Sequence, residues 1–222
     1  QIGPCFRAGE RGHRHTPEFT LLEWYRAGAG SEALIDDCRA LLQHAVQALG
    51  LSATLSYRGQ TLRLGGSWHK VSVRDAFCRW AGWDPLERWD AERFDEDMTM
   101  RVEPSLPRDA PCILHDYPAQ VASLARLHPS DPRTADRWEL YLGGLELANA
   151  YGELTEGAEQ RRRFREANDV RRRAGRRPYP PDEEFLTDLD QGRLPACAGI
   201  ALGVDRLVMV LLDLEDIAQV RA

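Results

Sequence analysis

The sequence is poor in lysine: Lys70 is the only one, although lysine and arginine together number 29 among 222 residues. We interpret this first as a coding bias and second as a functional signal. The formal net charge of −6 argues against a chain that coats nucleic acid along its whole surface. No apolar run approaches membrane-spanning length, so we expect no membrane partner. The remaining composition, 43% hydrophobic and 29% charged, is typical of a globular protein with one sizeable core.

Cysteine also lacks the spacing that metal sites require. No C-x-x-C pair occurs among the five cysteines, which are Cys5, Cys38, Cys78, Cys112 and Cys197. Their odd number and scatter argue against a zinc site and against a disulfide framework. We therefore expect reduced thiols and a cytoplasmic location.

Hydrophobic periodicity predicts an α+β fold, in which helices alternate with strands of antiparallel hairpins. Strands are expected at residues 2–7, 17–27 and 112–117, in a hairpin across 138–149, and at 199–202. Helices are expected at 31–49, 73–83, 157–175 and from 203 onward. Residues 84–111 are charged and interrupted by proline, and they predict no more than one short helix. No repeat or low-complexity linker divides the chain, so residues 1–222 are expected to form a single domain.

The stretch from Phe6 to Arg26 is the most informative of the chain, because two predicted strands flank a charged loop there. The cations Arg7, Arg14 and His15 gather near this loop, and arginine binds phosphate oxygens in a bidentate manner. On the second strand Phe19, Leu21, Glu23 and Tyr25 share one face. An aromatic ring beside cations suits a nucleoside triphosphate, and a carboxylate suits an ammonium group. The alternative is a solvated charged loop, although Glu23 among apolar residues is costly to bury without a cation.

A second constellation lies in the predicted hairpin with Gly143 and Gly144 at its turn. Tyr141 would then pair with Glu146, and Glu139 would lie diagonally across from Glu146 on the same face. Two carboxylates and substrate phosphates are a common ligand set for Mg²⁺. An exposed sheet face with solvated glutamates is the alternative.

Asn149, Tyr151 and Glu153 follow at alternating positions and could line a small polar pocket. Simple alternation places Asn149 on the face opposite Glu146, so a shared site requires a β-bulge or a bend. Farther along, glycines in the stretch from Gly199 to Arg206 permit close approach of a ligand, and Arg206 falls in the first turn of a helix, where the dipole favours anions.

The predicted helix at 157–175 and the residues just after it are rich in arginine. The arginines are Arg161, Arg162, Arg163, Arg165, Arg171, Arg172, Arg173, Arg176 and Arg177. They could dock an acidic partner. A solvated helix, balanced by Glu159, Glu166 and Asp169, explains them at least as well.

These segments together resemble a known family. Phe6–Arg26 resembles motif 2 of class II aminoacyl-tRNA synthetases, and Gly199–Arg206 resembles their motif 3. Leu140–Leu154 and His115–Leu124 are similar to segments of the lysyl branch, so the resemblance covers nearly the whole chain in the right order. It implies an antiparallel sheet flanked by helices.

Within that branch, Pro17–Arg26 and Ala201–Arg206 are more similar to the elongation factor P (R)-β-lysine ligases than to the synthetases themselves. That group is a catalytic core without an anticodon-binding domain, and it charges a lysine side chain of a protein instead of a tRNA. The resemblance therefore implies a ligase that activates lysine or (R)-β-lysine with ATP and Mg²⁺ and transfers it to elongation factor P. A lysyl-tRNA synthetase fragment that charges tRNA and a non-catalytic binding paralogue are the alternatives.

The resemblance also implies roles for single residues. For ATP, Arg7 would contact the α-phosphate and the substrate carboxylate, Arg14 and His15 the outer phosphates, Phe19 one face of adenine and Arg206 the other face of the nucleotide. Glu139 and Glu146 would hold Mg²⁺. The lysine pocket would be formed by Glu23, Tyr25, Asn149, Tyr151 and Glu153, with Glu153 pairing with the ε-ammonium.

Two positions depart from the synthetase pattern. Gly9 stands where a glutamate usually follows the motif 2 arginine, and we expect Glu10 to take over its contact with the adenine end. Ala201 replaces a glycine and would reshape the floor of the substrate pocket. Motif 1, which forms the dimer interface of the family, has no counterpart in the sequence, so we expect further N-terminal material and a homodimer in the full-length protein.

Overall fold

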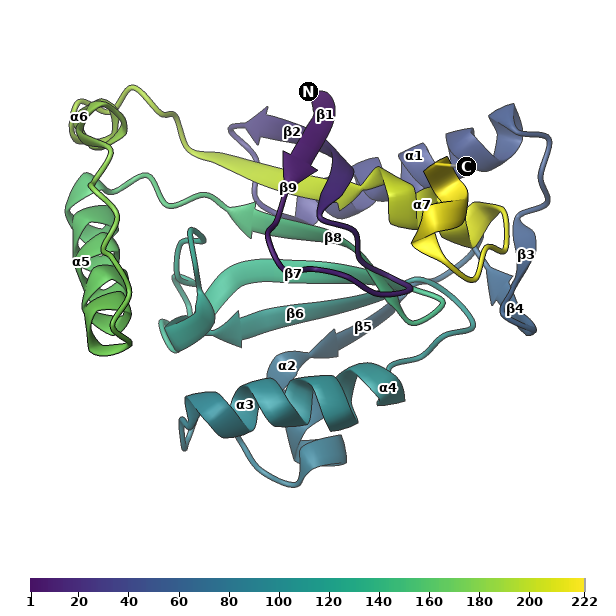
Figure 1. Ribbon diagram of the computed structural model, residues 1–222, viewed down its shortest axis with the longest axis horizontal. Helices are drawn as coiled ribbons and strands as arrows, with labels where there is room; N and C mark the ends of the chain where they lie inside the picture. The colour runs from purple at the N-terminus through teal and green to yellow at the C-terminus, as the bar shows by residue number, and fades with distance from the viewer. Residues whose placement is uncertain (222) are drawn as a thin grey trace.

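The computed structural model describes residues 1–221, apart from the side chain of Arg221, and its centre is one seven-stranded sheet (Figure 1). The strand order is β1-β2-β9-β8-β7-β6-β5, and all neighbours are antiparallel except β5 and β6. These strands are β1 (Ile2–Phe6), β2 (Glu18–Ala27), β5 (His69–Ser72), β6 (Cys112–Pro118), β7 (Thr134–Leu142), β8 (Leu145–Gly152) and β9 (Cys197–Gly203). A separate hairpin consists of β3 (Thr54–Tyr57) and β4 (Gln60–Arg63). The α+β prediction is confirmed.

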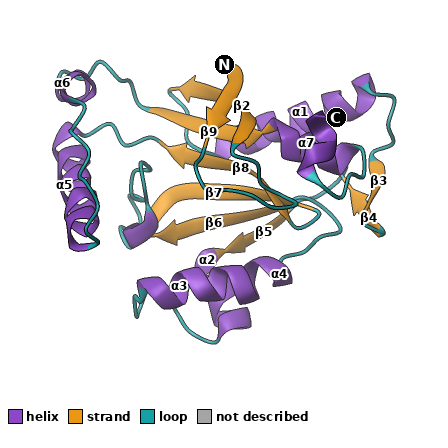
Figure 2. Ribbon diagram, viewed as in Figure 1, coloured by secondary structure: helices purple, strands orange, loops and turns teal. Residues whose placement is uncertain are grey.

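Helices flank the sheet and stand at both of its ends (Figure 2). The longer ones are α1 (Glu32–Ala48), α3 (Ala91–Asp97), α5 (Gly157–Arg173), α6 (Glu183–Asp190) and α7 (Val204–Leu211). The shorter ones are α2 (Val73–Ala76), η1 (Phe77–Ala81), η2 (Met98–Val102), α4 (Glu103–Ser105), η3 (Ala119–Val121) and η4 (Ile217–Arg221). None of the helices in residues 1–221 has the length and apolar character needed to cross a bilayer.

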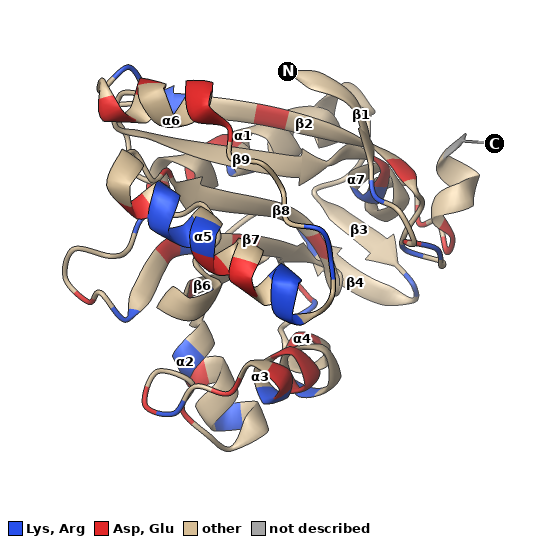
Figure 3. Ribbon diagram, turned by 60° about the vertical axis from the view of Figure 1, so that its left-hand side comes forward, with Lys and Arg blue, Asp and Glu red and all other residues tan. Residues whose placement is uncertain are grey.

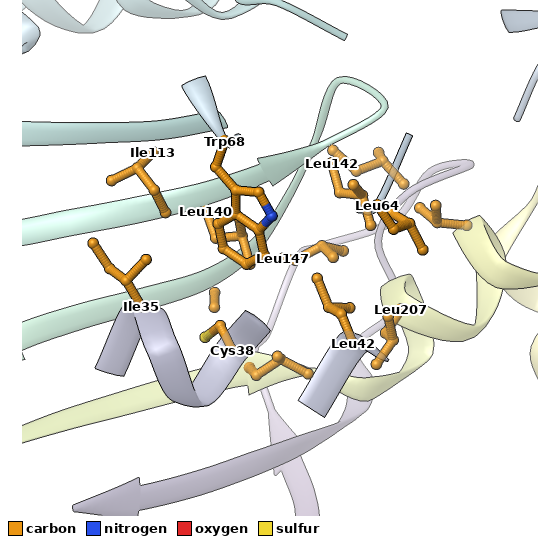
Figure 4. Close-up of a cluster of buried hydrophobic side chains, with 14 of the residues drawn as sticks. Ile35, Cys38, Leu42, Leu64, Trp68, Ile113, Leu140, Leu142, Leu147 and Leu207 are labelled. Carbon is orange, nitrogen blue, oxygen red and sulfur yellow. The ribbon is translucent and has the colours of Figure 1, made fainter. Parts of the chain in front are cut away.

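One face of the sheet packs against α1 and α7 through the main hydrophobic core. Ile35, Cys38 and Leu42 of α1 point toward Leu140 and its neighbours on β7 and β8 (Figure 4). Leu42 and Leu140 are completely buried. Each such leucine stabilises the fold by roughly 1.5–3 kcal/mol, so this face is committed to packing.

The opposite face is only partly covered. A second core joins Phe77 of η1 and Phe94 of α3 to Leu114 of β6 and Tyr141 of β7. The helices α2 to α4 therefore cover the β5–β7 side of this face. The part formed by β2, β9 and β8 is left for the loop between β1 and β2, which crosses the sheet in Figure 1. The candidate site lies here.

A β-bulge in the β7–β8 hairpin sets the orientation of the site strand. Leu140 pairs with Ala148 and Tyr141 pairs with Glu146, so Leu147 is the extra residue. Leu147 and Ala148 both belong to the main core. Because the bulge shifts the alternation by one residue, Glu146 and Asn149 point to the same face. The bulge that the sequence analysis required is present.

Other elements differ from the sequence predictions. The hairpin β3–β4 was not predicted, because its strands are short and its turn residues, Arg58 and Gly59 at φ 50° and 74°, are not a usual Asn-Gly or Asp-Gly pair. β5 and α6 were also missed. The segment 84–111 carries a helical run from Ala91 to Ser105 instead of one short helix, and Asp90 caps its start by accepting a hydrogen bond from the backbone N–H of Arg93.

Candidate active site

A cavity of about 430 Å³ opens on the uncovered face of the sheet, a size within the range of roughly 300–1,000 Å³ typical of ligand pockets. Of the fourteen residues proposed from the sequence, thirteen line it: Arg7, Glu10, Arg14, His15, Phe19, Glu23, Tyr25, Glu146, Asn149, Tyr151, Glu153, Ala201 and Arg206. They come from β2, β8, β9, α7 and the β1–β2 loop, apart from Glu153, which directly follows β8. The structure thus brings together residues 199 positions apart in the chain, while their roles stay predictions.

Arg206 connects several elements at the end of the cavity that is lined by Arg7, Arg14 and His15. Its Nη1 donates to the backbone oxygen of Glu146 at 2.7 Å, and its Nη2 donates to Nε2 of His15 at 2.8 Å. A histidine nitrogen that accepts from arginine must be unprotonated. Burial and the Arg206 charge accordingly lower the pKa of His15 below 6.5. The same guanidinium therefore ties α7 to β8 and to the β1–β2 loop.

Arg7 and Phe19 stand on the other side of this end. The guanidinium carbon of Arg7 lies 5.8 Å from the centre of the Phe19 ring, and Nη1 of Arg7 is 3.0 Å from Oε1 of Glu10. The Arg7 side chain is 66% exposed, so this ion pair is weak and can be exchanged for a ligand anion. Glu10 lines the cavity, as expected for a residue that takes the place of the glutamate missing at Gly9.

The opposite end of the cavity is acidic. Glu23 and Glu153 line it together with Tyr25, whose pKa is raised by burial and by both carboxylates. Among the described residues, no side chain donates a hydrogen bond or a salt bridge to the Glu153 carboxylate. Burial without a partner raises the pKa of Glu153 to about 7. A half-buried carboxylate in this state is stabilised by an external cation.

Gly199 makes room for that carboxylate. A Cβ atom at this position would overlap Oε1 of Glu153 and the ring of Tyr25. We expect Gly199→Ala to displace both groups and to weaken binding of an ammonium ligand at this end of the cavity by about tenfold or more, as one methyl group in a pocket does. Calorimetric titration with lysine measures this effect. Gly65→Ala is the matched control, because a Cβ at Gly65 meets nothing within 4 Å. Equal affinities of the two variants would contradict the role of Gly199.

Glu139 is the one proposed residue that does not line the cavity. It pairs with Asn149 across the β7–β8 ladder, and its side chain accepts hydrogen bonds from Asn149 Nδ2 at 3.1 Å and from Tyr141 at 2.8 Å. A salt bridge of 2.7 Å joins it to Arg137. Arg137 also donates to the backbone oxygen of Val121 at 2.7 Å. Glu139 therefore lies behind the residues that line the cavity, and its hydrogen bond fixes the side chain of Asn149.

Sequence reasoning missed Arg137 and Tyr141 as parts of this network. Arg137, Glu139 and Tyr141 alternate along β7 and thus share the site face, which was the available signal. The guanidinium of Arg137 lies 4.3 Å from the centre of the Tyr117 ring. Only 15% of the Arg137 side chain is exposed, and the carboxylate of Glu139 balances its charge.

Glu139 and Glu146 are the residues that could hold a divalent cation. Partial removal from water and the neighbouring Glu139 carboxylate raise the pKa of Glu146. A cation beside Glu146 would relieve this repulsion, and a carboxylate suits Mg²⁺. Glu139 would have to exchange one of its hydrogen bonds from Arg137, Asn149 or Tyr141 to join the ligand set. Within residues 1–221 no cluster of three or more histidine, cysteine or acidic residues forms a metal site, so the remaining ligands would come from a phosphate substrate and water.

Comparison with known proteins identifies the class. The model of the tRNA synthetases class II (D, K and N) matches residues 1–222. The chain belongs to this family, which confirms the resemblance seen in its motifs.

The curated relatives narrow the class. One from Yersinia enterocolitica is 40% identical over 234 residues, one from Hamiltonella defensa 39% over 229 residues, and one from Vibrio cholerae 36% over 244 residues. Each alignment covers 100% of this chain and 70% of the relative. All three are named elongation factor P--(R)-beta-lysine ligase. The chain is accordingly a ligase of the class II synthetase type.

Proposed function

We propose that the protein activates lysine or (R)-β-lysine with ATP and transfers it to a lysine side chain of elongation factor P. The observation that carries this proposal is the division of charge in one cavity. Arg7, Arg14 and Arg206 line one end of the cavity, and Glu23 and Glu153 line the other end. A triphosphate and an ammonium group fit these ends at the same time. The names of the curated relatives support the same substrates.

The reaction proceeds in two steps. A carboxylate oxygen of the amino acid attacks the α-phosphorus of ATP in line, the bond to the β-phosphate oxygen breaks, and pyrophosphate leaves. The ε-amine of the acceptor lysine then attacks the acyl carbonyl of the adenylate. AMP leaves with the electron pair of the broken C–O bond, the amine loses a proton, and an amide remains.

The chain's own residues contribute position and charge to the first step. Arg7 and Arg206 contact the phosphates and neutralise the negative charge that develops on them. Phe19 stacks on adenine, and Glu10 contacts its edge. Mg²⁺, held by Glu139 and Glu146, would add Lewis-acid stabilisation of the phosphate oxygens. We also propose a homodimer and a cytoplasmic location for the full-length protein.

The pocket carboxylate predicts a pH dependence. Only ionised Glu153 pairs with the substrate ammonium, and its pKa in the free protein is about 7. The apparent KM for the amino acid should therefore fall as the pH rises through 7 and should level off above it. Burial and the Arg206 charge lower the pKa of His15, so its titration is displaced to the acid side of this transition. Pyrophosphate exchange between pH 6 and pH 8.5 measures the profile, and a KM that is flat across this interval would refute the assignment.

The acceptor is tested by competition. The full-length protein is incubated with ATP, labelled lysine or (R)-β-lysine, elongation factor P and bulk tRNA in one tube. The proposal predicts label in elongation factor P, and an intact mass increased by one lysyl unit. Label confined to tRNA would replace the proposal with tRNA charging. Absence of adenylate formation in a folded sample would point instead to a non-catalytic paralogue.

A further inference from the structure

The arginine-rich segment after β8, residues 161–179, consists of two parts that differ in how their arginines are paired. In the first part, residues 161–163, each arginine forms a salt bridge. Arg161 forms salt bridges of 2.8 and 2.7 Å with Glu183 and Asp190 of α6. Arg162 and Arg163 bind Glu159 at 2.7 and 2.8 Å. These arginines therefore fix α5 to α6 and stabilise α5, so they have a structural role.

The second part is not balanced. Residues 165–179 contain six arginines and two carboxylates, in a chain whose net charge is −6. Among the described residues, the exposed side chains of Arg165, Arg176 and Arg177 form neither a salt bridge nor a hydrogen bond, and Arg173 donates only to the backbone oxygen of Asp169 at 3.4 Å. In Figure 3 the colours alternate along the first turns of α5, whereas its last turn and the loop that leaves it are blue.

Helix stability does not account for this charge. Cations in the last turn of a helix interact favourably with its dipole, which explains arginines up to Arg173. Arg176 and Arg177 lie beyond the end of α5. Their segment is nevertheless held in place, because Asn168 exchanges two hydrogen bonds of 2.9 Å with the backbone of Tyr179. The positive surface is therefore ordered rather than a loose tail.

Apolar groups accompany the cations. Val170 is 59% exposed and Tyr179 is 66% exposed, and the guanidinium of Arg171 lies 3.9 Å from the centre of the Tyr179 ring. Tyrosine and arginine are the residues enriched where proteins bind proteins. Affinity for a phosphate backbone comes chiefly from cations and does not require the exposed Val170 beside them. The composition favours an acidic protein surface as the partner.

The segment is fixed relative to the acidic end of the cavity. Helix α5 begins at Gly157, four residues after Glu153. Arg163 donates to the backbone oxygens of Ser123 and Ala125 at 2.8 and 2.7 Å, and Leu124 between them lines the cavity. A macromolecule bound to the end of α5 would thus be held at a constant distance from the activated amino acid.

We propose that the surface formed by Arg165, Val170, Arg173, Arg176, Arg177 and Tyr179 docks an acidic face of the acceptor protein. This inference rests on the proposed function and adds the recognition step to it. Charge complementarity raises the rate of encounter and aligns the acceptor, and it contributes nothing to adenylate formation. The surface should therefore act on the second step alone.

The test is the double variant Arg176→Glu/Arg177→Glu of the full-length protein. Both positions lie outside the helix and neither side chain has a partner in the described chain, so the fold should be retained. We expect the KM for elongation factor P to rise about tenfold, with less dependence on salt than in the unmodified protein. The kcat at saturating elongation factor P and the amino-acid-dependent pyrophosphate exchange should not change.

The matched control is Arg79→Glu/Arg88→Glu, which changes the charge equally at exposed positions next to α2 and α3. An unchanged KM for elongation factor P in Arg176→Glu/Arg177→Glu would overturn the docking surface, as would the same increase in both double variants. Loss of tRNA binding without an effect on elongation factor P would overturn it in favour of an RNA partner. Failure of the proposed function is distinct, because it would abolish protein labelling by the unmodified enzyme.

Discussion

Glu153→Gln should lower kcat/KM for lysine or (R)-β-lysine by about 100-fold, while ATP affinity stays within about twofold. The carboxylate has no partner among the described residues, and its pKa of about 7 reflects burial alone. Glutamine has nearly the same volume but cannot carry charge, so the substrate ammonium would be left desolvated without a counterion. Loss of a charge-assisted hydrogen bond costs about 1.5–3 kcal/mol, and tenfold corresponds to about 1.4 kcal/mol.

Pyrophosphate exchange at varied amino-acid concentration measures this loss, and calorimetric titration measures ATP binding. Glu184→Gln is the control, because Glu184 is an exposed glutamate on α6 with no contact to the cavity. A Glu153→Gln variant with the kinetics of Glu184→Gln would remove Glu153 from substrate recognition. Equal loss for amino acid and ATP would instead indicate damage to the fold.

Arg206→Ala should lower the rate of adenylate formation by about 10²–10³-fold, the usual effect of removing a donor aimed at developing charge. Two consequences combine in this variant. The phosphates lose a cation, and the β1–β2 loop loses the hydrogen bond from Arg206 to His15 at 2.8 Å. Amino-acid binding at the Glu153 end should change little, since Arg206 lies at the other end of the cavity.

Arg206→Lys separates charge from geometry. Lysine keeps the positive charge but lacks the planar fork that reaches Glu146 and His15 at once. We expect its exchange rate to lie between those of Arg206→Ala and the unmodified protein. Arg88→Ala, at an exposed position without a side-chain partner in the described chain, is the control. An Arg206→Ala variant that forms adenylate at a normal rate would exclude Arg206 from catalysis.

The sequence indicated most of the residues that gather at the cavity, but it did not predict every element of the surrounding fold. Phe19, Glu23 and Tyr25 stand at alternate positions of a ten-residue strand, so the face that they share could be assigned from strand geometry. Arg206 could also be predicted, because it lies in the first turn of a helix that follows a glycine-containing strand, and this turn faces the site. The short strands β3, β4 and β5 lack such alternation over enough residues to be recognised.

Two features of the site depend on packing between strands and could not be predicted in full. The bulge at Leu147 follows from the register of β7 against β8, and alternation alone leaves Asn149 on the opposite face. The depth of Glu139 depends on Arg137 and Tyr141, whose donors face its carboxylate. The sequence therefore indicated which groups gather at the cavity, but not which of them line its wall and which support it.

A crystal structure of the full-length protein with ATP and (R)-β-lysine tests the central claim most directly. We expect both ligands in one cavity, with phosphate oxygens within hydrogen-bonding distance of Arg7 and Arg206 and the side-chain ammonium against the carboxylate of Glu153. A nucleotide bound elsewhere, or an ammonium group turned away from Glu153, would contradict it.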